Sequence, residues 1–99
     1  MFSNSKLTAE QRVERKEMLR QLPKGSTMAN DGRTTFLCVP DGTVTRVFSS
    51  VMSEDEVKFR RKVGEFYALV RHFYDPSGGL ILPGSDWTAN VVRDAVTYA

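Results

Sequence analysis

The chain has few of the residues from which disulfides and metal sites are built. Its 99 residues include one cysteine, Cys38, and one histidine, His72. One cysteine cannot form an intrachain disulfide, and one cysteine with one histidine cannot complete a zinc site. We therefore expect no metal and no other cofactor. Since proteins without disulfides are typical of reducing compartments, we also expect a cytoplasmic location.

Catalytic motifs are missing as well. The chain contains no GxGxxG or GKS/T loop that could cradle a phosphate. Asp41 is explained by a turn, and Glu54 and Asp55 by a helix cap, so no pair of carboxylates is left for acid–base chemistry. Cys38 lies in an apolar strand, where burial raises a thiol pKa, and a lone helical histidine such as His72 is ordinarily a boundary residue. The sequence predicts a protein that is not an enzyme.

Long apolar runs are also absent. The longest, residues 36–39 and 80–82, are too short to cross a bilayer. The opening MFSNSK has no apolar core like that of a signal peptide. These features predict a soluble protein that does not associate with a membrane.

The remaining composition is typical of a folded globular domain. Hydrophobic residues make up 40% of the chain and charged residues 26%, and the length allows one domain. We expect a flexible tail over residues 1–7 and a single small α+β domain over residues 8–99. The 14 basic and 12 acidic side chains nearly balance, so attraction to a polyanion has to come from a local cluster.

Capping patterns and hydrophobic periodicity predict three helices. The first follows Thr8, covers residues 9–22 and ends at Pro23, although its apolar residues form no clear stripe. A long amphipathic aromatic helix covers residues 54–74, and a short C-terminal helix covers residues 86–98. The apolar face of the long helix consists of Phe59, Val63, Phe66, Val70 and Phe73.

Between the first two helices the pattern predicts a small antiparallel sheet of two to four strands. Asp-Gly turns at residues 31–32 and 41–42 bracket a strand, which indicates a hairpin over residues 33–49. A three-residue loop at the second turn would pair Val39 with Thr43. Further candidate strands are residues 26–29 and 80–82.

Both faces of this predicted hairpin are apolar. One face would carry Phe36, Cys38, Val44 and Phe48, and the other Leu37, Val39, Thr45 and Val47. A sheet with one solvated face would alternate more regularly between apolar and polar residues. Each face is therefore either covered by another element or open to a partner.

The most basic passage lies on the long helix. Acidic residues one turn away can neutralise most of its cations, as Glu65 can for Arg61. We interpret the passage as the solvated back of a helix whose aromatic front is buried. The alternative is that the cations contact nucleic-acid phosphates, which would make binding steeply salt-dependent. The residues of this alternative site are Lys58, Arg60, Arg61, Lys62 and Arg71.

Apolar residues outside the expected core favour a protein partner. On the C-terminal helix, Val92 and Val96 lie opposite the face that carries Trp87 and Val91. Together with one face of the hairpin they form the predicted partner-binding set: Val92, Val96, Leu37, Val39 and Val47. We expect a small non-enzymatic protein-binding module that acts as an adaptor or inhibitor by covering a surface of its partner.

Two further expectations accompany this hypothesis. Very small cytoplasmic proteins without chemistry of their own are common among phage and mobile-element products that block host enzymes, which makes such an origin plausible. The seven-residue spacing of Phe59, Phe66 and Phe73 leaves a homodimer open, although a monomer core is the simpler interpretation.

Overall fold

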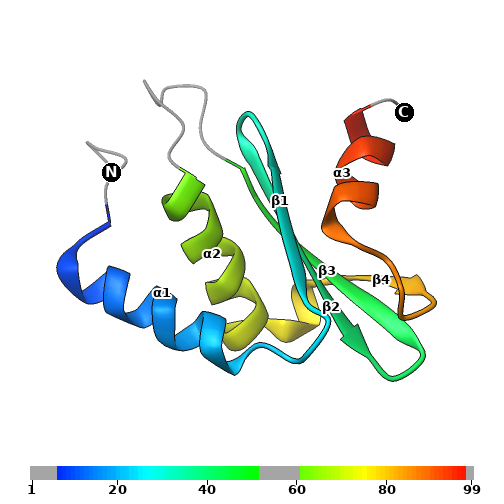
Figure 1. The fold of residues 1–99 in the computed structure, drawn as a ribbon, viewed down its shortest axis with the longest axis horizontal. Helices are drawn as coiled ribbons and strands as arrows, with labels where there is room; N and C mark the ends of the chain where they lie inside the picture. Colours follow the sequence, from blue (N-terminus) through cyan, green and yellow to red (C-terminus); the bar gives the residue numbers. More distant parts are fainter. Residues whose placement is uncertain (1–6, 52–60, 98–99) are drawn as a thin grey trace.

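The structure is a computed structural model in which residues 7–51 and 61–97 are described. It confirms the α+β class, with three α-helices and one four-stranded antiparallel sheet (Figure 1). The elements are α1 (Ala9–Gln21), β1 (Thr27–Asp31), β2 (Thr34–Asp41), β3 (Val44–Val51), α2 (Arg61–Tyr74), the short 3₁₀ helix η1 (Pro76–Gly78), β4 (Leu80–Pro83) and α3 (Ala89–Thr97).

The sheet is a meander in which the strands lie in the order β1-β2-β3-β4. The candidate strands at residues 26–29 and 80–82 are thus confirmed as β1 and β4. Two-residue loops close the first two hairpins and begin with Gly32 and Gly42. The φ angles of these glycines, 57° and 68°, lie in the left-handed region that the first loop position of a type II′ turn requires.

The register of β2 against β3 differs from the predicted one. Val39 lies opposite Arg46, whereas the expected three-residue loop would have paired it with Thr43. The prediction was wrong because Asp41 still belongs to β2, which leaves Gly42 and Thr43 as the whole loop. Since the two registers differ by an odd number of residues, every β3 side chain points to the face opposite to the one predicted.

One face of the sheet packs against α1 and α2, which lie on the same side of it (Figure 1). Leu37, Val39 and Phe48 point to this face and are buried there. Met18 joins them from α1, which packs on α2. The α2 side chains that complete this first core are Val63, Phe66, Ala68 and Leu69.

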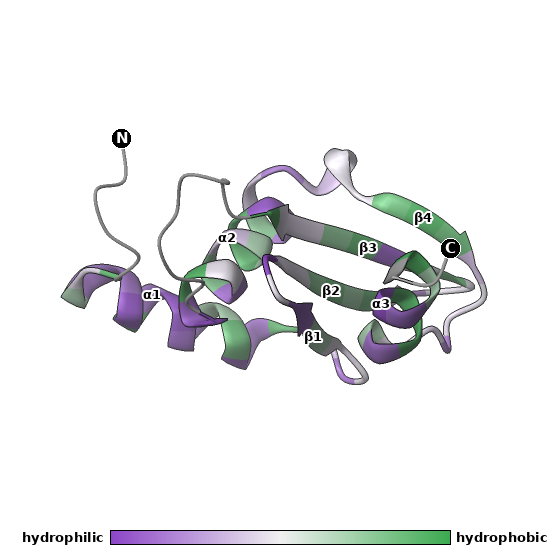
Figure 2. Ribbon diagram, turned by 90° about the horizontal axis from the view of Figure 1, so that it is seen from above, coloured by the Kyte–Doolittle hydropathy of each residue, from purple (hydrophilic) through white to green (hydrophobic). Residues whose placement is uncertain are grey.

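The opposite face is covered by α3, which lies against β1 and β2 (Figure 2). The second core consists of Ala29, Phe36, Cys38, Val47, Ala89 and Val92. Both apolar faces are therefore covered within the chain, and the molecule has three layers with the sheet in the middle.

The first helix begins with the predicted capping box. Thr8 Oγ1 accepts the Gln11 N–H at 3.1 Å, and the Thr8 N–H donates to Gln11 Oε1 at 2.9 Å. Leu7 was assigned to a flexible tail but is buried in the first core, where Arg12 Nη1 donates to its carbonyl at 3.0 Å. The packed domain thus begins before Thr8, and the rest of the predicted tail lies outside the described residues.

Only the C-terminal part of the predicted long helix lies within the described residues, as α2. Residues 54–60, with Phe59, lie outside them, so the predicted length is not confirmed. Val63 and Phe66 are buried as predicted. The remaining stripe residues of α2 pack half-buried at the margin of the first core.

The last helix begins later than predicted. It was predicted over residues 86–98, but α3 starts at Ala89. Thr88 takes the capping position, where its Oγ1 accepts the Val91 N–H at 3.3 Å. The Ala89 N–H donates to Thr27 Oγ1 of β1 at 2.8 Å, which ties the start of α3 to the sheet.

Gly79, between η1 and β4, lies directly against the first core. A β-carbon there would come within 2.7 Å of Phe48 Cε1, and this ring is too deeply buried to move aside. We expect Gly79→Ala to lower the free energy of unfolding by about 1–3 kcal/mol, as in other overpacked cores. Gly78→Ala is the control, because its nearest neighbour is the exposed carboxylate of Asp75. Urea unfolding that shows equal losses for both variants would contradict this packing.

Candidate functional site

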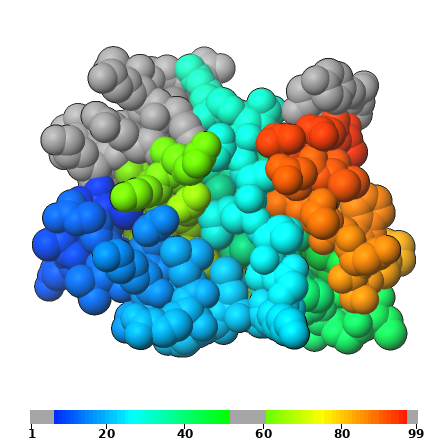
Figure 3. Space-filling view, viewed as in Figure 1, coloured from blue at the N-terminus to red at the C-terminus, as the bar shows by residue number. Residues whose placement is uncertain are grey.

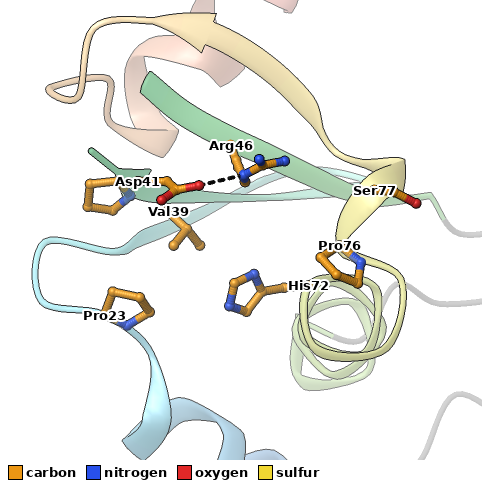
Figure 4. Close-up of a pocket in the computed structure, with 8 residues that line it drawn as sticks. Pro23, Val39, Asp41, Arg46, His72, Pro76 and Ser77 are labelled. Atoms are coloured by element: carbon orange, nitrogen blue, oxygen red, sulfur yellow. Dashed lines mark hydrogen bonds and ion pairs between the residues drawn. The ribbon is translucent and has the colours of Figure 1, made fainter. Parts of the chain in front are cut away.

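A pocket opens between the β2–β3 hairpin, the end of α2 and η1, on the α2 side of the sheet (Figure 4). Its volume is about 560 Å³, within the usual range for sites that hold a small ligand. Three prolines and a valine form apolar walls, and an ion pair and a histidine supply the main polar groups. The full lining is Pro23, Val39, Pro40, Asp41, Arg46, His72, Pro76 and Ser77.

An ion pair stands at the rim of the pocket. Arg46 Nε donates to Asp41 Oδ2 at 2.8 Å (Figure 4). The two side chains are 32% and 56% exposed, so the pair contributes little to stability. Its effect is to orient the guanidinium, whose Nη groups have no partner among the described residues. These groups can donate to a carbonyl or carboxylate of a ligand.

His72 projects from α2 into the pocket (Figure 4). Its imidazole stands edge-on to Phe48 and Phe73, with ring centroids 5.1 Å and 4.5 Å away. The Nδ1 atom is shielded from solvent and has no hydrogen-bond partner in the described part of the chain. Burial lowers the pKa of His72, and the Arg46 cation lowers it further. At neutral pH the ring is therefore an uncharged hydrogen-bonding group.

The thiol of Cys38 does not lie in the pocket with His72, so the two side chains do not form a nucleophile–base pair. Cys38 points to the opposite face of the sheet, where it is fully buried in the second core. Burial raises the pKa of this thiol to about 11, which keeps it protonated and unreactive. The pocket can hold a ligand whose apolar part lies against the prolines and Val39 and whose polar atoms bond to His72 and Arg46.

The strand next to β3, which contributes Arg46 to the pocket, lies at an edge of the sheet. β4 pairs with β3 on one side and has no strand on its other side among the described residues. Ile81 lies opposite Arg46 and so shares the pocket's face, whereas Leu80 lies opposite Val47 on the α3 face. Leu80 and Ile81 are 61% and 52% exposed. Two exposed aliphatic side chains on an unpaired strand are typical of an interaction surface.

Four of the five predicted partner-binding residues are core residues. Leu37 and Val39 are buried in the first core, and Val47 and Val92 in the second. The expectation that they form an open surface was wrong, because α2 and α3 cover both faces of the sheet. Val96 is the one member of the set that is exposed, at 59%, and its part in binding stays a prediction.

The predicted nucleic-acid site is described only in part. Its members were Lys58, Arg60, Arg61, Lys62 and Arg71; the first two lie outside the described residues, and the other three are exposed on α2. Glu65, which was expected to pair with Arg61, accepts instead from Arg15 of α1 at 2.8 Å. Within the described ranges, none of the three exposed cations has a carboxylate partner.

The pocket was not predicted from the sequence because it depends on strand pairing. Asp41 and Arg46 meet only because the hairpin closes in two residues, and Ile81 reaches Arg46 only in the register of β3 with β4. The edge strand itself was a candidate, at residues 80–82, because a proline that ends a short apolar strand is typical of a sheet edge.

Comparisons of the chain with protein-family models, with curated protein sequences and with solved structures find no match. Within the described residues, no helix has the length and apolar character needed to cross a membrane. The same residues contain no cluster of three or more side chains suited to holding a metal ion.

The burial of Val92 can be tested by placing a charge there. We expect Val92→Asp to lower the free energy of unfolding by about 3 kcal/mol or more, because the carboxylate would have no partner in the second core. Val96→Asp, one turn later on the exposed surface, should change it by less than about 0.5 kcal/mol. Thermal and urea unfolding compare the two; a stable Val92→Asp protein would contradict the docking of α3.

The depressed pKa of His72 predicts how stability varies with pH. The unfolded chain takes up its proton near pH 6.5, above the folded pKa, so stability should fall as the pH drops below about 6.5. NMR titration of this sole imidazole should give a midpoint below 6.5, which Arg46→Gln raises only in part because burial is the larger cause. His72→Gln should remove the acid-dependent loss measured by urea unfolding. A midpoint at or above 6.5 would contradict this environment.

Proposed function

We propose that this chain is a non-enzymatic protein-binding module that takes an extended segment of its partner as an added strand along β4. The single observation that carries the proposal is the outer edge of β4, which has no partner strand among the described residues and bears two exposed aliphatic side chains. One of them, Ile81, lies opposite Arg46 at the rim of the His72 pocket. Addition of a strand to a free sheet edge is a recurrent mode of peptide recognition.

The hydrogen-bonding pattern identifies the backbone groups that a partner can use. The Gly84 N–H donates to the Thr43 carbonyl at 2.9 Å, which continues the β3–β4 ladder beyond Pro83. Because backbone groups alternate in direction along an antiparallel pair, Leu80 and Leu82 point toward β3 and Ile81 points outward. The Ile81 N–H and C=O therefore face the free edge. Pro83 also faces outward, where its missing N–H disturbs no pairing with β3.

The side chains beside this edge would determine which segments bind. β4 has four residues, so main-chain pairing alone offers few hydrogen bonds. An apolar side chain of the partner that enters the pocket beyond Arg46, the residue opposite Ile81, would add buried area. A carbonyl or carboxylate beside that side chain could accept from the Nη groups of Arg46. We therefore propose a segment with an apolar anchor and an adjacent acceptor.

A module of this kind acts by covering the surface from which the bound segment comes. This fits an adaptor or an inhibitor and requires no chemistry from the chain itself. A cytoplasmic setting and a phage or mobile-element origin stay expectations, drawn from the single cysteine and the small size of the chain.

Ile81→Pro tests the proposed mode, because it removes the outward N–H without removing a bond to β3. Peptides selected from a random displayed library by the wild-type protein would be measured by fluorescence polarisation against each variant. We expect Ile81→Pro to weaken binding at least about tenfold, and Ile81→Thr, which keeps the N–H and suits a strand, to weaken it less.

Chemical-shift mapping locates the bound peptide, and the largest changes should fall on β4 and on residues that line the pocket. Selected peptides that bind Ile81→Pro as tightly as wild type, or that change the chemical shifts of other elements instead, would overturn the proposal.

Sedimentation of the free protein tests whether β4 pairs with a second copy of the chain. If β4 instead pairs with its copy in a second chain, the wild type is a dimer and Ile81→Pro a monomer, which would also overturn peptide capture.

A further inference from the structure

We infer that the chain carries a second interaction surface, a basic tract that binds the phosphate backbone of a nucleic-acid strand. The tract does not depend on the protein-binding function proposed above. It comprises six cations from the three helices: Arg12, Arg15, Lys16, Arg61, Lys62 and Arg93.

The first part of the tract is a pocket of about 340 Å³ between α1 and α2. Its lining contains four cations and no acidic residue: Ala9, Arg12, Val13, Arg15, Lys16 and Lys62. Like charges gathered around a concave surface repel one another, and an anion in the pocket relieves that repulsion. A pocket of this composition is therefore suited to a phosphate group.

The ion pair between Arg15 and Glu65 fixes the geometry of this pocket. Arg15 Nη2 and Nε donate to Glu65 Oε1 at 2.8 Å and 3.2 Å. The two side chains are only 17% and 16% exposed, so the pair is well shielded and joins α1 to α2. Glu65 thereby neutralises Arg15 and leaves Lys16 and Lys62 without a carboxylate partner in the described structure. Because this ion pair joins α1 to α2, Lys16 of α1 and Lys62 of α2 line the same pocket.

The second part is a polar pocket of about 210 Å³ on the other side of the same ion pair. Arg61 of α2 and Arg93 of α3 line it with Asn30 of β1 and Asn90 of α3, and Glu65 is shared with the ion pair. Figure 3 shows α1, the start of α2, β1 and α3 adjacent across this face of the molecule. The two pockets thus form one tract, with the Arg15–Glu65 pair at its centre.

The charge and extent of the tract favour a nucleic-acid strand over other anions. Arg12, Lys16, Arg61 and Lys62 have no carboxylate partner within the described residues, whereas Arg93 pairs with Asp94 at 3.1 Å. A single phosphate would occupy one pocket and leave the other empty, whereas a strand presents phosphates at regular intervals along both. The lining of the two pockets contains no aromatic residue, whereas aromatic anchors are enriched in protein–protein interfaces.

The expected binding is non-specific with respect to sequence. Arginine and lysine contacts to phosphates position a strand but do not read its bases, and the two asparagine amides are too few to read more than one. Binding should therefore be of micromolar strength at physiological salt and depend steeply on ionic strength. In Figure 2, β1 and β4 lie at opposite margins of the sheet. A nucleic acid near β1 would leave the β4 edge free for a protein.

The test uses a labelled single-stranded oligonucleotide and fluorescence anisotropy, with the full chain, from about 50 to 200 mM salt. The tract variant carries Lys16→Gln and Lys62→Gln. We expect it to bind at least tenfold more weakly than wild type, with a slope of log K against log salt that is shallower by about 1.5, since two phosphate contacts are lost. All substituted residues are exposed, and circular dichroism with urea unfolding confirms that each variant is folded.

The matched control carries Lys24→Gln and Arg71→Gln, which remove two exposed cations that line neither pocket. It should bind within about twofold of wild type, because these positions lie off the tract. If both variants bind the oligonucleotide equally more weakly than wild type, the binding comes from general electrostatic attraction and the proposal is overturned. Absence of binding at the lowest salt would overturn it as well. Neither result affects the proposed peptide binding at β4, which is tested separately with Ile81→Pro.

Discussion

The two-residue loop at Gly42 sets the arrangement of the rest of the molecule. Because side chains alternate between the faces of a sheet, the register of β3 against β2 decides which residues of β3 meet α2 and which meet α3. The observed register places Phe48 beneath α2 and Val47 beneath α3. With a three-residue loop these residues would exchange faces, and neither helix would meet the surface it now covers. The left-handed conformation that this loop needs is available to glycine without strain.

Because the helices cover both faces of the sheet, a partner can reach the sheet only at its edges. At one margin, β4 has no further strand beside it among the described residues and carries exposed aliphatic side chains, and the His72 pocket lies by the neighbouring strand β3. At the other margin, β1 lies beside the basic surface where all three helices contribute cations. The two margins differ in chemistry: the proposed protein segment would bind at one and the proposed nucleic-acid strand at the other. This separation would let one small domain hold two unlike partners.

Features of the fold that depend on neighbours in sequence could be predicted. The Thr8–Gln11 capping box is set by side chains three residues apart, and the end of α1 near Pro23 follows from the geometry of proline. Features that depend on distant neighbours could not. Val92 was predicted to be exposed because the periodicity of a helix does not show which of its faces the sheet covers. Glu65 was predicted to pair with Arg61, one turn away, but the packing of α1 on α2 brings Arg15 to it.

The amino-acid sequence by itself determined the α+β class, the positions of the turns and most helix ends. These properties follow from local conformational preferences and from composition, which act over a few residues. Only the tertiary structure decided the strand register, the covering of both sheet faces, the pocket at His72 and the alignment of α1 with α2 through Arg15. Such features arise from contacts between residues far apart in the chain, and their energies depend on which surfaces meet.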